Sequence, residues 1–88
     1  MGTIYDKDNI KLSLFDRSQH HGHNISHIHA NDHGERLWFD AEGNICEGKS
    51  KNSKAILKWI RSHQSEIKKR LKLLAEGKEI TTIDGDIV

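Results

Sequence analysis

The sequence predicts an α+β protein: a small antiparallel sheet of three to five short strands, with one long C-terminal amphipathic helix, straight or kinked, packed on one face. Two observations predict it. Apolar and polar residues alternate in short runs over the first two thirds of the chain, which is typical of half-buried strands. In residues 50–76, apolar residues instead recur every three or four positions, which is typical of a helix.

The predicted strands are short and separated by turn-forming residues. The clearest is the run from residue 10 to residue 15, where Ile10, Leu12 and Leu14 alternate with polar side chains. Asp8 and Asn9 precede it and are typical of a tight turn. The other predicted strands are residues 3–5, 25–30, 36–39 and 45–47, with residues 80–83 as a candidate edge strand and the polar stretch 16–24 as a loop.

The C-terminal helix is predicted to span residues 50–76. At about 100° per residue, its apolar positions and one histidine fall within an arc of roughly 80°. These positions are Ile56, Ile60, His63, Ile67, Leu71 and Leu74. Ser50 or Ser53 is suited to cap the N-terminus, and Gly77 to end the helix. A break within residues 62–65 is the alternative, but the shared phase favours one helix.

The whole chain, residues 1–88, is predicted to form a single domain with a mobile tail over residues 84–88. One helix leaves the other face of the sheet partly open, and a homodimer is one way to cover it. Cys46 is the only cysteine, which excludes an intrachain disulfide. No apolar run approaches the length of a membrane span, about 18 residues, and the polar start lacks a signal sequence. A cytoplasmic protein without membrane association is therefore expected.

The formal net charge of +1 conceals a strong segregation. Residues 49–72 hold nine basic side chains and one acidic one, whereas the flanking segments are acidic. Seven of these basic residues lie within about 100° of the helix circumference, opposite the apolar arc. This basic stripe comprises Lys51, Lys54, Lys58, Arg61, Lys68, Lys69 and Lys72. It predicts contacts with nucleic-acid phosphates, with docking on an acidic partner and a simple solvated face as alternatives.

Six of the seven histidines lie between residues 20 and 33. His27 and His29 are two positions apart, so in a strand their imidazoles point to the same side, with Cα atoms about 7 Å apart. His63 lies in the apolar arc of the helix and completes the cluster if the helix covers that face. Because imidazole titrates near neutral pH, these three are the predicted catalytic residues. The structural alternatives are a polar strand face and a core histidine that donates to a carbonyl.

A metal centre is a second interpretation of the histidines. His23, His27 and His29 are ligands of the kind that zinc or another divalent metal prefers, with His63 as a possible fourth. Asp32 or Asp40 would supply a carboxylate, although the spacing selects neither.

The order of these residues resembles a known family. His23, His27 and His29 are followed by Gly43-Asn44-Ile45, and then by Trp59 and His63. This pattern, together with the start Thr3-Ile4, is similar to the bacterial domain-of-unknown-function family four-one-six-zero. Ile25-Ser26 departs from it, because that family usually carries prolines there. Its members are similar to proposed toxin–antitoxin components. The resemblance therefore implies a two-gene module with a small protein partner encoded nearby, but no particular reaction.

Three functional hypotheses follow, and the sequence leaves open whether the protein is an enzyme. The first is a toxin–antitoxin component that binds or cleaves nucleic acid, RNA rather than DNA, through the histidines and the basic stripe. The second is a histidine-ligated metal-binding domain. The third is a non-catalytic protein-interaction domain, either an antitoxin or a dimerising scaffold.

Overall fold

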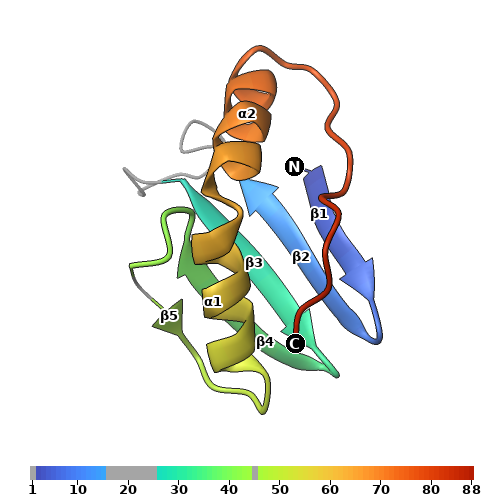
Figure 1. Cartoon of the computed structure of the whole chain (residues 1–88), viewed down its shortest axis with the longest axis vertical. Helices are drawn as coiled ribbons and strands as arrows, with labels where there is room; N and C mark the ends of the chain where they lie inside the picture. The colour runs from blue at the N-terminus through green and yellow to red at the C-terminus, as the bar shows by residue number, and fades with distance from the viewer. Residues whose placement is uncertain (1, 16–25, 45) are drawn as a thin grey trace.

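The computed structural model describes residues 2–15, 26–44 and 46–88, and it confirms the α+β class (Figure 1). Five antiparallel strands follow one another in sheet order, and two helices pack on one face. The strands are β1 (Gly2–Lys7), β2 (Ile10–Phe15), β3 (His27–Asp32), β4 (Glu35–Asp40) and β5 (Cys46–Glu47). The helices are α1 (Ser53–Ser62) and α2 (Gln64–Ala75).

Two-residue turns join β1 to β2 and β3 to β4. Their central residues all have positive φ: 53° at Asp8, 63° at Asn9, 52° at His33 and 93° at Gly34. This is the turn geometry that matches the right-handed twist of paired strands. The backbone N–H of His33 donates to the carbonyl of Asn9 at 2.9 Å, so the two turns are tied together at one end of the sheet.

The register of the strands sorts their side chains onto two faces. Leu12 lies opposite Ala30, and Ala30 lies opposite Leu37, so the three share a face. The same register puts Leu14, Ile28 and Phe39 on this face. All six are buried in one core with the helix residues Ile56, Ile60 and Ile67. This is the covered face, and the alternate residues form the opposite face.

The helical segment begins at Ser53, ends at Ala75 and is interrupted at His63. The single helix predicted over residues 50–76 is therefore wrong, and the alternative, a break within residues 62–65, is confirmed. Side chains donate hydrogen bonds to the backbone carbonyls next to this interruption. The carbonyl of Trp59 accepts hydrogen bonds from Ser62 Oγ at 3.0 Å and from His63 Nδ1 at 2.8 Å. The carbonyl of Ile60 accepts one from Gln64 Nε2 at 3.0 Å.

The two ends of the helical segment are held differently. Its N-cap is Asn52, rather than Ser50 or Ser53, and the Asn52 side chain makes no capping bond. Gly77 follows α2 with a φ of 75°, and the backbone N–H groups of Gly77 and Lys78 donate to the carbonyls of Leu74 and Leu73. This is the Schellman arrangement, which confirms Gly77 as the terminator. Within the described ranges, no helix has both the length and the apolar character to cross a bilayer.

The chain after α2 runs back along β1 and the helices rather than forming the edge strand predicted at residues 80–83 (Figure 1). Ile83 is buried, and its N–H donates to the carbonyl of Ile4 at 2.8 Å. Further along, Trp59 Nε1 donates to the carbonyl of Gly85 at 3.1 Å, and the N–H of Ile87 donates to Tyr5 Oη at 3.1 Å. Mobility of residues 84–88 stays a prediction.

A buried carboxylate joins the sheet to the start of α1. Asp32 is 2% exposed, and it accepts hydrogen bonds from the backbone N–H and the side-chain amide of Asn52 at 3.1 and 3.0 Å. Burial raises the pKa of Asp32, but hydrogen bonds from His33 and Asn52 outweigh it and hold this pKa well below its ordinary value of 3.8. The carboxylate is therefore ionised at neutral pH.

Replacing Asp32 by Asn is expected to lower the free energy of unfolding by about 1–3 kcal/mol at pH 7, because buried hydrogen bonds to a charged group are lost. Since the folded-state pKa lies below 3.8, the stabilisation by the carboxylate is complete above that pH and is lost as the pH falls further. Urea denaturation at pH 7 and at pH 3 should show the difference between the two proteins shrinking in acid. Asp86→Asn, at an exposed pair with Lys7, is the control and should change stability little.

Replacing Gly85 by Ala should destabilise the protein more than replacing Gly77 by Ala. Both glycines have positive φ, but a methyl group at Gly85 would lie 2.9 Å from His63 Nε2, whereas nothing lies within 4 Å at Gly77. Gly77→Ala therefore measures backbone strain alone, on the order of 1–2 kcal/mol. Thermal unfolding followed by tryptophan fluorescence compares the two variants. Equal losses of stability would mean that the chain around Gly85 does not rest against His63.

Candidate functional site

His27 and His29 lie together on the opposite face of the sheet, as their spacing predicts. The register pairs His27 with Phe15 on β2, and His29 with Trp38 on β4. The centroids of the two imidazoles are 5.0 Å apart, the Phe15 ring is 4.7 Å from His29, and the Trp38 ring is 5.6 Å from His27. These four residues form the aromatic cluster of this face.

Exposure differs within the aromatic cluster. His29 is exposed, Phe15 and Trp38 are half-buried, and His27 is only 2% exposed. Trp38 is fixed in addition by a hydrogen bond from its Nε1 to Glu47 Oε2 at 2.8 Å. His29 is therefore the histidine of the pair that a ligand reaches most directly.

Cations and amides continue the opposite face beyond the aromatic cluster. Lys11, Asn31 and Arg36 are aligned across β2, β3 and β4, and all three are exposed. They line a hollow of about 440 Å³ together with His29 and Ser13. An exposed imidazole, an ammonium group and a guanidinium group thus border one concave surface, a combination suited to an anionic ligand.

His63 does not join the histidine pair, which corrects the expected convergence. It lies between the two helices, on the covered side of the sheet, and its ring stacks on Trp59 with centroids 4.4 Å apart. Trp59 in turn contacts Tyr5 of the core, with ring centroids 5.3 Å apart. His63 therefore fits the structural alternative, a histidine that donates to a carbonyl beside Trp59.

The metal interpretation gains no support. His23 lies outside the described residues, so only two of the three predicted ligands, His27 and His29, can be placed. Among residues 2–15, 26–44 and 46–88, no group of three or more His, Cys, Asp or Glu side chains is placed to hold a metal ion.

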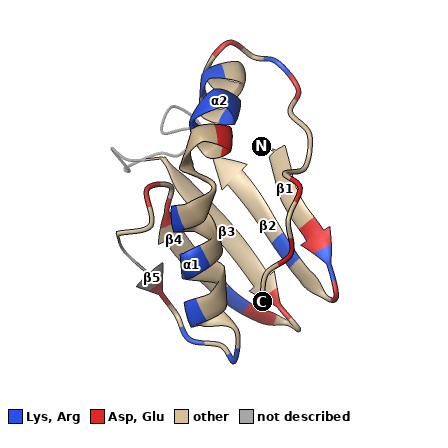
Figure 2. Ribbon diagram, in the orientation of Figure 1, with Lys and Arg blue, Asp and Glu red and all other residues tan. Residues whose placement is uncertain are grey.

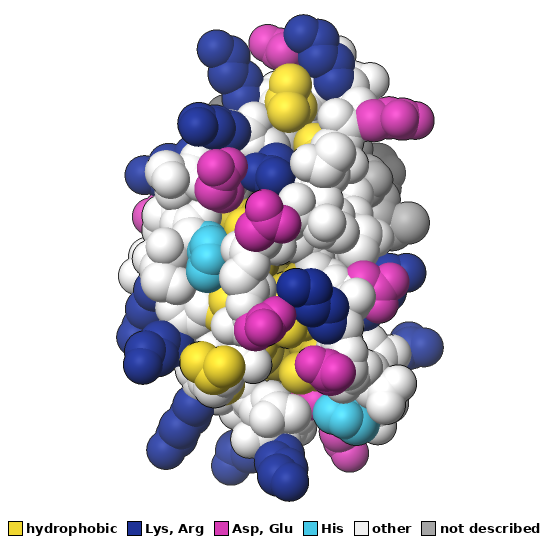
Figure 3. Space-filling view, turned by 45° about the vertical axis from the view of Figure 1, so that its right-hand side comes forward, with side chains coloured by type: hydrophobic (Ala, Val, Ile, Leu, Met, Phe, Trp, Pro, Cys, Tyr) yellow, Lys and Arg dark blue, Asp and Glu magenta, His cyan; other side chains and the backbone are white. Residues whose placement is uncertain are grey.

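The basic stripe lies on the outer side of α1 and α2 and in the turn that precedes them (Figure 2). All seven of its residues are exposed, and within the described part of the chain none forms an ion pair. Arg61 also donates from its Nε to the carbonyl of Gly43 at 2.8 Å. In Figure 3, Lys and Arg side chains gather along the helical flank, while acidic side chains lie toward the C-terminal segment. The helices thus separate the stripe from His29.

The structure brings together a further pair of polar side chains that the sequence did not predict as a site. His33 Nδ1 lies 2.7 Å from Asp32 Oδ1 at the tip of the β3–β4 hairpin. The two residues line a hollow of about 550 Å³ together with Glu35, Lys49, Ser50, Lys51 and Asn52. The sequence Asp32-His33-Gly34 places the two side chains next to each other, but the same sequence is also typical of an ordinary turn.

Comparison with known proteins identifies a family but no activity. The model of the family described as "Domain of unknown function (DUF4160)" matches residues 10–71, from the start of β2 into α2. No curated protein and no solved structure shows significant similarity to the chain. The match spans the aromatic cluster, the Asp32–His33 pair and most of the basic stripe. The chain therefore belongs to the DUF4160 family, which confirms the resemblance drawn from the sequence.

Proposed function

We propose that this protein binds single-stranded RNA on the face of its sheet opposite the helices. The observation that carries the proposal is the shared position of aromatic rings and cations on that face. Phe15, His29 and Trp38 supply rings, and Lys11 and Arg36 supply positive charge beside them. Within the described residues, both helices lie on the other face.

The chemistry of this face favours unpaired bases over a duplex. Unstacked bases bind to aromatic rings on open antiparallel sheets, while Lys and Arg contact the phosphates. The aromatic rings and cations lie on the sheet, so the same ligand can meet both. The basic stripe lacks interleaved aromatic side chains and lies in the helical layer, which suits it to phosphate contacts alone.

We further propose that the protein acts as one component of a toxin–antitoxin pair, with a small protein encoded nearby as its partner. The support is the membership of the chain in the DUF4160 family, whose resemblance implies such a pair, and the presence of a charged surface, the basic stripe, separate from the RNA-binding face. The acid–base role of His27 and His29 and the formation of a homodimer stay predictions.

Trp38→Ala is expected to weaken binding of a fluorescent single-stranded RNA by about 5- to 150-fold, which corresponds to about 1–3 kcal/mol for one stacked base. Trp38→Phe keeps a ring and should bind more tightly than Trp38→Ala. Lys11→Ala should lower the slope of log affinity against log salt by about 0.7, the value for one phosphate contact with a single strand. Fluorescence anisotropy measured over a series of salt concentrations gives both results.

Lys78→Ala is the matched control for Lys11→Ala, because Lys78 is exposed but paired with Glu76 at 3.1 Å and far along the chain. Lys68→Ala tests the basic stripe. If it reduces affinity while Trp38→Ala and Lys11→Ala leave it unchanged, the RNA lies on the helices and the proposal for the sheet face is wrong. A wild-type protein that binds the neighbouring gene product tightly, but no RNA, would favour the protein-interaction domain.

A toxin–antitoxin role predicts a growth phenotype. Expression of one of the two neighbouring genes alone should arrest bacterial growth, and expression of both should restore it. Counting viable cells after induction of each gene alone and of the pair measures this effect. Normal growth in all three cases would exclude the role without affecting the prediction of RNA binding.

A further inference from the structure

The Asp32–His33 pair at the tip of the β3–β4 hairpin has a defined hydrogen-bond polarity. Asp32 is buried and ionised, and an ionised carboxylate only accepts hydrogen bonds. His33 Nδ1, 2.7 Å from Asp32 Oδ1, must therefore carry the hydrogen. In the neutral ring this leaves the lone pair on Nε2, the nitrogen that faces away from Asp32. A carboxylate that orients a histidine in this way is the arrangement of a general base.

The carboxylate is itself held in place. Asn52 donates to Asp32 twice, from its backbone N–H and from its side chain, at 3.1 and 3.0 Å. On the other side, Gly34 N–H donates to Asn31 Oδ1 at 2.9 Å, which fixes the turn that carries His33. The base is thus oriented by residues of the β3–β4 hairpin and by Asn52 at the start of α1.

Three neighbouring hollows connect the RNA-binding face with His33. The hollow on the sheet face, next to His29, shares Lys11 and Asn31 with a second hollow of about 490 Å³. His33 lines this second hollow and also the hollow of about 550 Å³ that includes Asp32 and Lys51. A strand of RNA that follows these concave surfaces passes from the aromatic cluster, around the hairpin tip, to His33.

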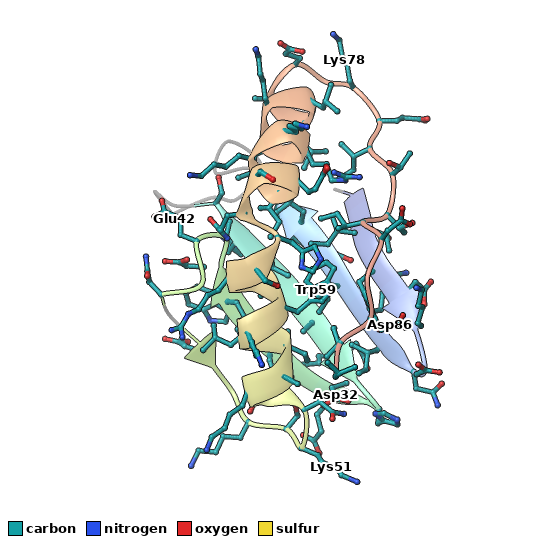
Figure 4. The ribbon with its side chains drawn as sticks, in the orientation of Figure 1. Asp32, Glu42, Lys51, Trp59, Lys78 and Asp86 are labelled. Carbon is teal, nitrogen blue, oxygen red and sulfur yellow. The ribbon has the colours of Figure 1, made fainter. Side chains whose placement is uncertain are left out.

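Positive charge is available where such a strand would end. Lys49 and Lys51 line the last hollow, both are exposed, and neither is in an ion pair with a described residue. Figure 4 shows Asp32 and Lys51 at the same end of the molecule. The ammonium groups of Lys49 and Lys51 are suited to hold a phosphodiester beside the imidazole of His33. They are also suited to stabilise the charge that develops on the phosphate oxygens during attack.

We propose that His33, oriented by Asp32, is the general base of an RNA-cleaving site, with Lys49 and Lys51 binding the scissile phosphate. This inference rests on the proposed binding of RNA to the sheet face. His33 Nε2 accepts the proton of a ribose 2′-hydroxyl, and the 2′-oxygen forms a bond to the adjacent phosphorus. The bond from phosphorus to the 5′-oxygen breaks, and this oxygen takes a proton from water. The resulting hydroxide removes the proton from His33, and the products are a 2′,3′-cyclic phosphate and a 5′-hydroxyl end.

The backbone of His33 permits a clean test. Its φ is 52°, a conformation that glycine adopts without strain, so His33→Gly removes the ring while keeping the turn. Asp8→Gly is the matched control, because Asp8 occupies the equivalent position of the other two-residue turn, with a φ of 53°, and lines none of the three hollows.

The experiment measures cleavage of a labelled single-stranded RNA by the full chain, and binding of the same sequence with 2′-O-methyl groups, which cannot be attacked. His33→Gly should lower kcat by about 100- to 10,000-fold, as expected for a general base. Added imidazole should restore part of the rate, whereas Asp8→Gly should cleave like the wild type. Asp32→Asn, which affects a positioning residue, should lower kcat with little change in KM.

The outcomes separate this inference from the proposed function. Binding of the 2′-O-methyl RNA without cleavage of the natural RNA overturns the cleaving site and leaves the RNA-binding face intact. Equal cleavage by His33→Gly and the wild type, or a loss that imidazole does not restore, overturns the role of His33. No binding of either RNA overturns both proposals.

Discussion

The alternation of side chains between the two faces of the sheet is the constraint on which the rest of this structure depends. Successive residues of a strand point to opposite sides, and the hydrogen-bond register aligns them with their neighbours. Ile28 is therefore buried under the helices because it aligns with Leu14 and Phe39. His27 and His29 must then point away from the helices. A slip of one residue in this register would exchange the two sides and bury the imidazoles in the apolar core.

The same constraint explains why the three predicted catalytic histidines do not meet. His63 belongs to the apolar arc of the helical segment, and that arc faces the sheet. His27 and His29 alternate with Ile28 and so belong to the side that the helices do not cover. Both facts are present in the sequence. Taken together, they exclude a common site, and the structure confirms that His63 instead packs against Trp59.

The sequence predicts more of the fold than of the candidate site. Strand positions followed from alternation, and Gly77 ended the helix as expected. The interruption at His63 was harder to predict, because the apolar phase continues through it. It depends on contacts between side chains and carbonyls: Ser62 and His63 with Trp59, and Gln64 with Ile60. The Asp32–His33 pair was hidden for a similar reason, since its geometry depends on Asn52, twenty positions along the chain.

The shortness of β5 has a consequence for how copies of this chain behave in concentrated solution. The outermost strand of a sheet presents unpaired backbone groups. Long, flat edge strands therefore pair with strands of other copies, edge to edge, and form insoluble assemblies. At the β5 edge of this sheet, that strand is two residues long within the described part of the chain. The backbone at Gly48, just after β5, also runs close to the carbonyl of Arg36. A methyl group added at Gly48 would lie only 3.0 Å from that oxygen. This flank therefore offers a poor template for growth of a fibril.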